Sequence, residues 1–292
     1  IVAGEPNSIF FEIFIKVISK NIFKSPIILI ASKNLLQRQI KFFNSKIKIH
    51  HLDYSKKKLE LKKLHKVNLI NVDYKQNKIF KKISNKSNQY IGNCFDIALE
   101  ILNKKISDKL INGPISKKYF LKKKFMGITE YLAKKTSSKK IAMIIYNKSL
   151  SVSPLTTHLP VKYITKKIKK YKIINKVKTI NSFWYKRFQY KPKIAITGLN
   201  PHCESIDDFN EDEKIIKPTI KYLKKNKYDI SGPYSADTVF LKNNRKKFDV
   251  IIGMYHDQVL TPAKTLFEYD AINITAGLPF IRVSPDHGPN EQ

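Results

Sequence analysis

The sequence predicts an α/β protein with a largely parallel sheet. Short apolar runs rich in Ile and Val, typical of buried strands, alternate with amphipathic stretches in which apolar residues recur at helical spacing. Such alternation is typical of strand–helix–strand units and not of all-β or all-α folds. Histidines follow three of the apolar runs directly. Loops at the carboxyl ends of parallel strands are where such sheets usually bind ligands.

The individual elements follow from the same periodicities. Amphipathic helices are expected over residues 92–102 and 211–225, and the Lys-rich residues 55–66 and 162–178 are predicted to be solvated helix faces. Six buried strands are expected, over residues 26–31, 109–113, 141–146, 151–156, 194–198 and 250–254.

The strong positive charge of the chain does not by itself indicate a nucleic-acid partner. The net charge is +33, and four of the 56 basic residues are arginines, which leaves 56 − 4 = 52 lysines spread along the chain. Specific nucleic-acid sites depend on arginine for bidentate contacts and stacking. We therefore expect no specific nucleic-acid binding, only loose association at low salt.

Composition favours a cytoplasmic protein without a membrane partner. No apolar run of about 18 residues occurs, and the first residues have neither the basic start nor the apolar stretch of a signal peptide. The two cysteines, Cys94 and Cys203, have no Cys-x-x-Cys spacing and fit a reducing compartment. We expect no disulfide between them.

Three histidines are candidate metal ligands. His158, His202 and His256 each follow an expected strand, in Thr-Thr-His-Leu-Pro, Gly-Leu-Asn-Pro-His and Met-Tyr-His-Asp-Gln. Imidazoles suit Zn or Co better than Mg, and three of them leave a tetrahedral ion with an open position for substrate. The alternative, in which each histidine only holds its loop by a hydrogen bond, remains open because the three lie far apart in the sequence.

A second set of residues would suit a small acidic substrate. Arg282 is notable in a chain that uses lysine almost everywhere else, because a planar guanidinium can hold a phosphate or carboxylate in two places. Lys264 and Asn273 add a cation and an amide. The alternative for Arg282 is an ordinary surface arginine.

Several nucleotide-binding and hydrolase motifs are absent. No Gly-x-Gly occurs among the nine glycines, so any dinucleotide binds without a Rossmann glycine turn. A Walker loop, a Gly-x-Ser-x-Gly elbow and a His-Glu-x-x-His helix are also missing.

Taken together, the motifs resemble the 4-hydroxythreonine-4-phosphate dehydrogenase family over nearly the whole chain. Eight peptides occur in the order typical of that family: Gly4-Glu-Pro6, Ile111-Asn-Gly-Pro-Ile-Ser-Lys117, Gly127-Ile-Thr-Glu130, Thr156-Thr-His-Leu-Pro160, Gly198-Leu-Asn-Pro-His202, Gly232-Pro-Tyr-Ser-Ala-Asp-Thr238, Tyr255-His-Asp-Gln258, and Asn273-Ile-Thr-Ala-Gly-Leu-Pro-Phe-Ile-Arg282 with the following Ser-Pro-Asp-His-Gly.

The resemblance implies two α/β/α domains like those of isocitrate and isopropylmalate dehydrogenases, with the active site in the cleft between them. The expected domains are residues 1–112 with 283–292, and residues 113–282, which carry the metal and substrate residues and the dimer contacts. In such a homodimer with shared sites, His158 and His202 bind the metal and His256 comes from the partner subunit.

The resemblance also implies roles for other residues. Lys264, Asp237 and Asp257 join the histidines as catalytic positions, although each aspartate could equally cap a loop. Thr129, Lys264, Asn273 and Arg282 are the implied substrate contacts, and Asp286, His287 and Gly288 begin the implied cofactor loop.

The reaction implied is oxidation of the C3 hydroxyl of 4-phosphooxy-L-threonine by NAD, with loss of CO2, to give 3-amino-2-oxopropyl phosphate for pyridoxal phosphate biosynthesis. A divalent metal, Zn first and Co or Mg as alternatives, would polarise the reacting oxygen. Two other functions remain open: a paralogous dehydrogenase for another phosphorylated hydroxy acid, such as a four-carbon sugar acid phosphate, or a basic nucleic-acid-associated protein without enzymatic activity.

The chain departs from the family pattern at several places. Ile128 stands where the family has the histidine of Gly-His-Thr-Glu, and Asn7-Ser-Ile-Phe10 and Cys203-Glu-Ser-Ile-Asp-Asp-Phe209 replace glycine-rich segments. Family members continue beyond the equivalent of Gln292 with a loop and helix at the cofactor site. We therefore expect a fragment that binds metal but uses NAD poorly.

Overall fold

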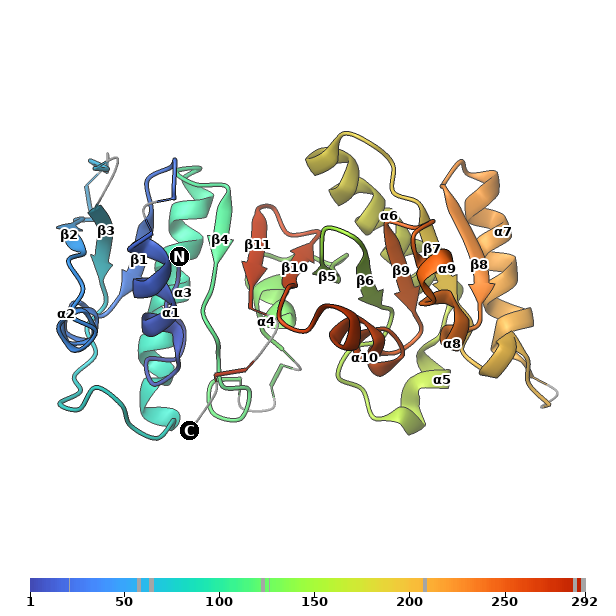
Figure 1. The fold of residues 1–292 in the computed structure, drawn as a ribbon, viewed down its shortest axis with the longest axis horizontal. Helices are drawn as coiled ribbons and strands as arrows, with labels where there is room; N and C mark the ends of the chain where they lie inside the picture. The colour runs from blue at the N-terminus through green and yellow to red at the C-terminus, as the bar shows by residue number, and fades with distance from the viewer. Residues whose placement is uncertain are drawn as a thin grey trace. The chain divides into compact units, whose positions relative to one another are not determined.

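The computed structural model describes residues 1–20, 22–56, 59–62, 66–121, 124–125, 127–206, 209–285 and 288–289. The chain divides into two compact units (Figure 1). Unit 1 comprises residues Ile1–Ile128 with Phe280–Gln292, and unit 2 comprises Thr129–Pro279.

Unit 1 is built on parallel strands. Strand β3 (Lys66–Asn71) lies between β1 (Ile28–Ala31) and β2 (Lys48–His51), and β4 (Lys109–Ile111) pairs in parallel with β11 (Ile281–Ser284). Val2 bridges Ile30 and Asn112 and so links the two sets of strands. The helices are α1 (Phe10–Ile18), α2 (Lys33–Phe42), η1 (Asn85–Ser87) and α3 (Asn88–Asn103).

The core of unit 1 forms where the apolar faces of these elements meet. Phe10, Phe11 and Phe14 of α1 pack with Leu35 and Leu36 of α2 in one buried cluster. The cluster also includes strand residues of β1 and β3. Ser32 caps α2, since its side chain accepts a hydrogen bond from the backbone N–H of Leu35.

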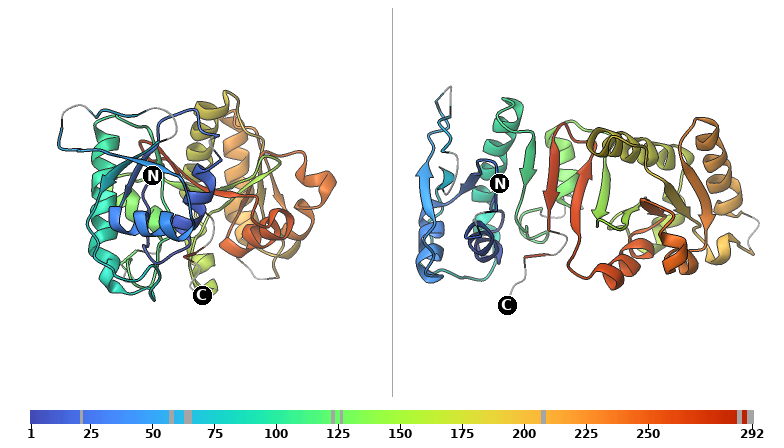
Figure 2. Two further views of the ribbon diagram at one scale, coloured as in Figure 1. Left: turned by 60° about the vertical axis from the view of Figure 1, so that its left-hand side comes forward. Right: turned by 45° about the horizontal axis from the view of Figure 1, so that its top comes forward.

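Unit 2 is a mixed sheet with helices on both faces. Its strands lie in the order β10-β5-β6-β9-β7-β8, in which β6, β9, β7 and β8 are parallel and β5 is antiparallel to both of its neighbours. Figure 2 shows α6 and α10 on opposite faces of these strands. The strands are β5 (Ala142–Tyr146), β6 (Ser151–Pro154), β7 (Ile194–Thr197), β8 (Ile230–Tyr234), β9 (Val250–Gly253) and β10 (Ile272–Ala276).

Two long helices of unit 2, α6 and α10, cover its sheet. In chain order, the helices of this unit are α4 (Ile128–Lys135), η2 (Val161–Tyr163), α5 (Ile164–Lys167), α6 (Lys170–Phe188), η3 (Pro201–Cys203), η4 (Asp212–Ile216), α7 (Lys217–Lys225), α8 (Ala236–Val239), α9 (Lys242–Arg245) and α10 (His256–Phe267). No helix among the described residues is long and apolar enough to cross a membrane.

The α/β class and the six expected strands are confirmed, and both expected helices are present. The expected helix at the Lys-rich residues 55–66 is wrong for their described part, which consists of a turn, irregular chain and the first residue of β3. Side chains at both ends explain this conformation: Asp53 accepts hydrogen bonds from Ser55, and Asn68 bonds the backbone of Lys62 in both directions. Cys94 and Cys203 are free, as expected.

The unit boundaries differ from the expected domain boundaries at 112/113 and 282/283. Residues 113–128 belong to unit 1, where Gly113 donates a backbone hydrogen bond to Val2 and Glu5 donates one to Pro114. Residues 280–282 also belong to unit 1, because β11 pairs with β4.

Candidate metal and substrate site

The topology of unit 2 brings the three candidate histidines to one edge of its sheet. His158 follows β6, His202 lies in η3 after β7, and His256 begins α10 after β9. Strand β9 pairs in parallel with both β6 and β7. The carboxyl ends of the three strands therefore share one edge, which is the usual ligand-binding edge of parallel sheets.

Two of the histidines lie close together. The ring centroids of His158 and His256 are 5.5 Å apart, with an angle of 39° between the ring planes. Two imidazoles that share a zinc ion at about 2.0 Å have ring centres roughly 5 to 6 Å apart. The pair therefore fits a shared divalent ion.

Asp257 lies beside His256. Its carboxylate is 2.6 Å from Nδ1 of His256. A carboxylate in this position fixes the tautomer of a metal-binding histidine and leaves its other nitrogen for the ion. The sequence suggested either a catalytic or a loop-capping role for Asp257, and the catalytic role stays a prediction.

Strained backbone marks two of the histidine loops. His158 has φ 28° and His202 has φ 52°, in the left-handed region that residues other than glycine rarely adopt. Strained residues of this kind persist where the surrounding structure holds them, and they concentrate at functional sites.

His202 does not join the other two histidines within one chain. Over the described ranges of the chain, no group of three His, Cys, Asp or Glu side chains is arranged to hold a metal ion. The structure thus brings His158 and His256 of one chain together and leaves His202 exposed on its own loop. This arrangement differs from the one that the resemblance implied, in which His158 and His202 share a chain and His256 comes from the partner subunit.

Gln258 holds these loops in place, a role that no sequence pattern predicts. Its Oε1 accepts hydrogen bonds from the Thr197 hydroxyl (2.8 Å) and the Met254 backbone (2.7 Å), and its Nε2 donates to the Gly198 carbonyl (2.7 Å). This buried amide joins the ends of β7 and β9. It fixes the start of the His202 loop relative to the helix that carries His256.

Asp212 supports the His202 loop from its other side. This fully buried carboxylate accepts hydrogen bonds from the backbone N–H groups of Leu199 and Asn200, at 2.8 and 3.1 Å, and from the Asn200 side chain at 3.0 Å. Gly198 is required here, because a Cβ atom would lie 2.6 Å from Cys203 Sγ and 2.7 Å from the Asp212 carboxylate.

The candidate substrate residues Thr129 and Asn273 lie in one region of unit 2. The buried Thr129 hydroxyl is 3.3 Å from that of Thr275 in β10. Asn273 precedes Thr275 by two residues, so the two share a face of the strand. Asn273 Oδ1 is buried and has no hydrogen-bond donor among the described residues, so it could accept one from a ligand.

The remaining candidates are more scattered. Lys264 is half-buried later in α10, and Asp237 is exposed in α8. Arg282 is fully buried in unit 1, where its Nε donates a 2.8 Å hydrogen bond to Asn112 Oδ1. Of the expected cofactor loop, Asp286 and His287 lie outside the described residues, and Gly288 is exposed.

Lys176 is a buried cation that the sequence placed on a solvated face. It lies in α6 and is 9% exposed, and burial lowers its pKa to about 8 although the charge of Glu130 opposes this shift. Glu130 follows Thr129 in α4, and its Oε1 accepts a 3.3 Å hydrogen bond from the Thr157 hydroxyl. The buried ammonium group of Lys176 is therefore linked, through Glu130 and Thr157, to the chain segment that leads to His158.

We expect Lys176 to make the free energy of unfolding depend on pH in the alkaline range. The folded chain releases the proton near pH 8 and the unfolded chain near 10.5, so between these values the unfolded state binds more protons. The free energy of unfolding should therefore rise with pH across this window, by about 2 to 3 kcal/mol. The rise should be absent in Lys176→Met. Urea unfolding of both proteins at several pH values measures the difference, and parallel curves would contradict it.

Comparisons with known proteins identify the family. Residues 23–290 match the family of the pyridoxal phosphate biosynthetic protein PdxA. A 4-hydroxythreonine-4-phosphate dehydrogenase of Sulfurihydrogenibium sp. is 38% identical over 99% of this chain and 89% of its own length. One from Wigglesworthia glossinidia brevipalpis is 36% identical over 99% of this chain and 87% of its own.

A solved structure agrees. The crystal structure of 4-hydroxythreonine-4-phosphate dehydrogenase from Klebsiella pneumoniae superposes with a TM-score of 0.82 at 26% identity, and the match covers 99% of this chain and 90% of that one. The strand order, the histidine loops and these matches point the same way: the chain belongs to the family of pyridoxal phosphate biosynthetic protein PdxA.

Proposed function

We propose that the chain is an NAD- and divalent-metal-dependent dehydrogenase that oxidises the C3 hydroxyl of 4-phosphooxy-L-threonine and releases CO2, giving 3-amino-2-oxopropyl phosphate for pyridoxal phosphate biosynthesis. The pairing of His158 with His256 at the ligand-binding edge of unit 2 carries this proposal. The names of the related enzymes support it. The proposal includes a cytoplasmic homodimer.

The donor set fits a divalent metal, Zn first and Co or Mg as alternatives. His158 and His256 would hold the ion as a pair, with Asp257 orienting the second imidazole, and His202 would complete the set. When bound, the ion would supply a Lewis acid for a substrate oxygen, and NAD would supply the hydride acceptor.

The chain's own residues would bind and orient the substrate. The Thr129 hydroxyl and the Asn273 amide present polar atoms at α4 and β10. Lys264 in α10 would supply a cation for the carboxylate or phosphate, and Asp237 would be an acidic group near the metal. Arg282 would bind the phosphate, and the segment Asp286–Gly288 would contact the cofactor.

The direct test is NADH formation by the purified chain with 4-phosphooxy-L-threonine. Because the chain is expected to use NAD poorly, we expect slow NADH formation with stoichiometric CO2 release, loss of activity after chelation, and recovery with Zn or Co. Metal-independent turnover, or NADH formation without CO2, would contradict the proposal.

Ile128 keeps a second dehydrogenase function under consideration. It replaces a histidine of the family motif directly before Thr129, and a D-threonate 4-phosphate dehydrogenase of Salmonella typhimurium is 33% identical over 67% of this chain. The same assay with D-threonate 4-phosphate separates the two functions. A higher kcat/KM with D-threonate 4-phosphate would replace the first substrate by the second.

A further inference from the structure

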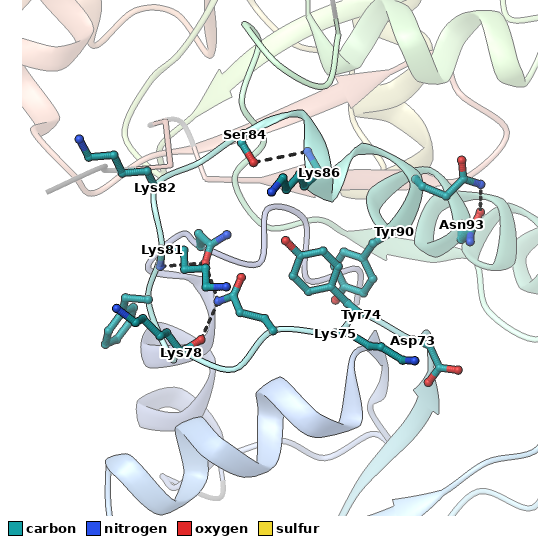
Figure 3. A pocket seen from close by; sticks show the side chains of 14 residues that line it. Asp73, Tyr74, Lys75, Lys78, Lys81, Lys82, Ser84, Lys86, Tyr90 and Asn93 are labelled. Atoms are coloured by element: carbon teal, nitrogen blue, oxygen red, sulfur yellow. Dashed lines mark hydrogen bonds between the residues drawn. The ribbon is translucent and has the colours of Figure 1, made fainter.

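Lys176 and Glu130 place two opposite charges in unit 2 that the proposed chemistry does not use. Most lysines of the chain are solvated: Lys78, Lys81 and Lys86, for example, are exposed around a cavity of about 830 Å³ in unit 1 (Figure 3). Lys176 is 9% exposed and is the only buried lysine among the described residues. A buried ammonium is costly unless an opposite charge compensates it.

Glu130 supplies the opposite charge. It acts on Lys176 from the first turn of α4, where the helix N-terminus favours a carboxylate. The Oε2 atom of Glu130 is buried and has no hydrogen-bond donor among the described residues. No direct ion pair joins it to Lys176 in the part of the chain that the structure describes. The two charges therefore attract each other through the protein interior, where this attraction is stronger than in water.

The other oxygen of Glu130 holds the loop of His158. Oε1 accepts a 3.3 Å hydrogen bond from the hydroxyl of Thr157, which directly precedes His158. The backbone of His158 lies in the left-handed region, with φ 28°, and such a conformation persists only where the surrounding contacts hold it. The bond between Thr157 and Glu130 is one of these contacts, so it affects where the imidazole lies.

A second hydroxyl holds the same loop on another side. Thr156 Oγ1 donates a 2.8 Å hydrogen bond to the carbonyl of Met254, which follows β9 and precedes His256 by two residues. Thr156 therefore joins the His158 loop to the start of α10, and Thr157 joins it to α4. Loss of either bond would leave the loop attached on one side fewer.

We propose that Glu130 is a positioning residue for the candidate metal ligand His158. Its carboxylate, held in place by the buried Lys176 ammonium, fixes the Thr157 hydroxyl and so aligns the imidazole. Because Glu130 follows the candidate substrate residue Thr129 in α4, it also links the substrate side of the site to the metal side. The inference rests on the proposed function in one respect, that His158 binds a divalent ion.

Titration of the full chain with Co tests the proposal, with the visible absorption of the bound ion as a measure of its ligand geometry. We expect Thr157→Val to raise the Kd for Co about tenfold and to change the spectrum, since residues that support a metal ligand contribute about 10- to 100-fold. Thr157→Ser keeps the hydroxyl and should restore both. The matched control Thr136→Val removes a half-buried hydroxyl that bonds to the Leu132 carbonyl at the end of α4, and it should change neither.

Two double variants separate positioning from general destabilisation. Glu130→Ala should weaken Co binding as Thr157→Val does, and Glu130→Ala/Thr157→Val should bind no more weakly than either single variant, because both changes remove the same bond. At neutral pH, below the pKa of about 8 of Lys176, Glu130→Gln and Lys176→Met each leave one buried charge unpaired. Glu130→Gln/Lys176→Met leaves neither charge and should bind Co more tightly than either of them.

The outcomes distinguish this inference from the proposed function. Additive losses in Glu130→Ala/Thr157→Val, or equal Kd values for Thr157→Val and Thr136→Val, would overturn the positioning role and leave the metal site intact. A wild-type chain that binds no Co would overturn both. If Glu130→Ala lowers the unfolding temperature more than Thr157→Val does, the comparison of valine with serine at position 157 decides alone.

Discussion

Mixing His202→Asn chains with His256→Ala chains should restore about a quarter of wild-type metal content and activity, although each variant alone has neither. In a two-fold dimer whose sites take His202 and His256 from different subunits, a mixed dimer has one intact site of two. Random mixing makes half of the dimers mixed, hence roughly a quarter of the sites.

The expectation follows from how the histidines are arranged in one chain. His158 and His256 lie close together, and His202 does not join them in a three-residue cluster among the described residues. A second copy could complete the set. Each variant alone should lose metal affinity by more than about 100-fold, since even the loss of a residue that only supports a ligand costs 10- to 100-fold.

Asparagine is the appropriate replacement at position 202. His202 has φ 52°, and asparagine tolerates this left-handed backbone while lacking the imidazole. Mixtures of each variant with itself are the control. Metal analysis that shows no recovery in the His202/His256 mixture would mean that one chain holds all three ligands, or that the subunits do not exchange. Mixing differently tagged wild-type chains separates these two explanations.

The sequence predicted those parts of the fold that depend on local periodicity. The apolar runs at residues 141–146 and 250–254 contain β5 and β9, because such runs become buried in a sheet wherever it forms. For the described part of the Lys-rich residues 55–66 the prediction was wrong, because lysine content does not distinguish a helix from irregular chain held by side chains such as Asp53 and Asn68.

Only those residues of the site that belong to a recognisable motif at the end of a strand could be predicted from the sequence. Each histidine could be placed after its strand, and parallel pairing then brought His158 and His256 together. The roles of Gln258 and Asp212 could not be predicted in this way, because both residues act through hydrogen bonds to backbone groups that are distant in the sequence. The burial of Lys176 likewise depends on packing of α6, which its neighbours in sequence do not reveal.

Arg282→Ala should lower the free energy of unfolding by about 3 to 5 kcal/mol. The side chain is fully buried, so the substitution leaves a cavity and removes the hydrogen bond to Asn112 Oδ1. Arg282→Lys keeps the charge but cannot reproduce the Nε contact, and about 1.5 to 3 kcal/mol should be lost. Urea unfolding measures both values.

The matched control is Arg245→Lys. Arg245 donates a 2.8 Å hydrogen bond to the Phe240 carbonyl but is half-buried, so its replacement should cost less than about 1 kcal/mol. The proposed phosphate contact requires in addition that Arg282→Lys raises KM for the phosphorylated substrate more than Arg245→Lys does. If Arg282→Lys lowers stability but leaves KM equal to that of Arg245→Lys, Arg282 only supports the segment around Asn112. If Arg282→Lys raises KM at wild-type stability, the Arg282 guanidinium contacts the substrate.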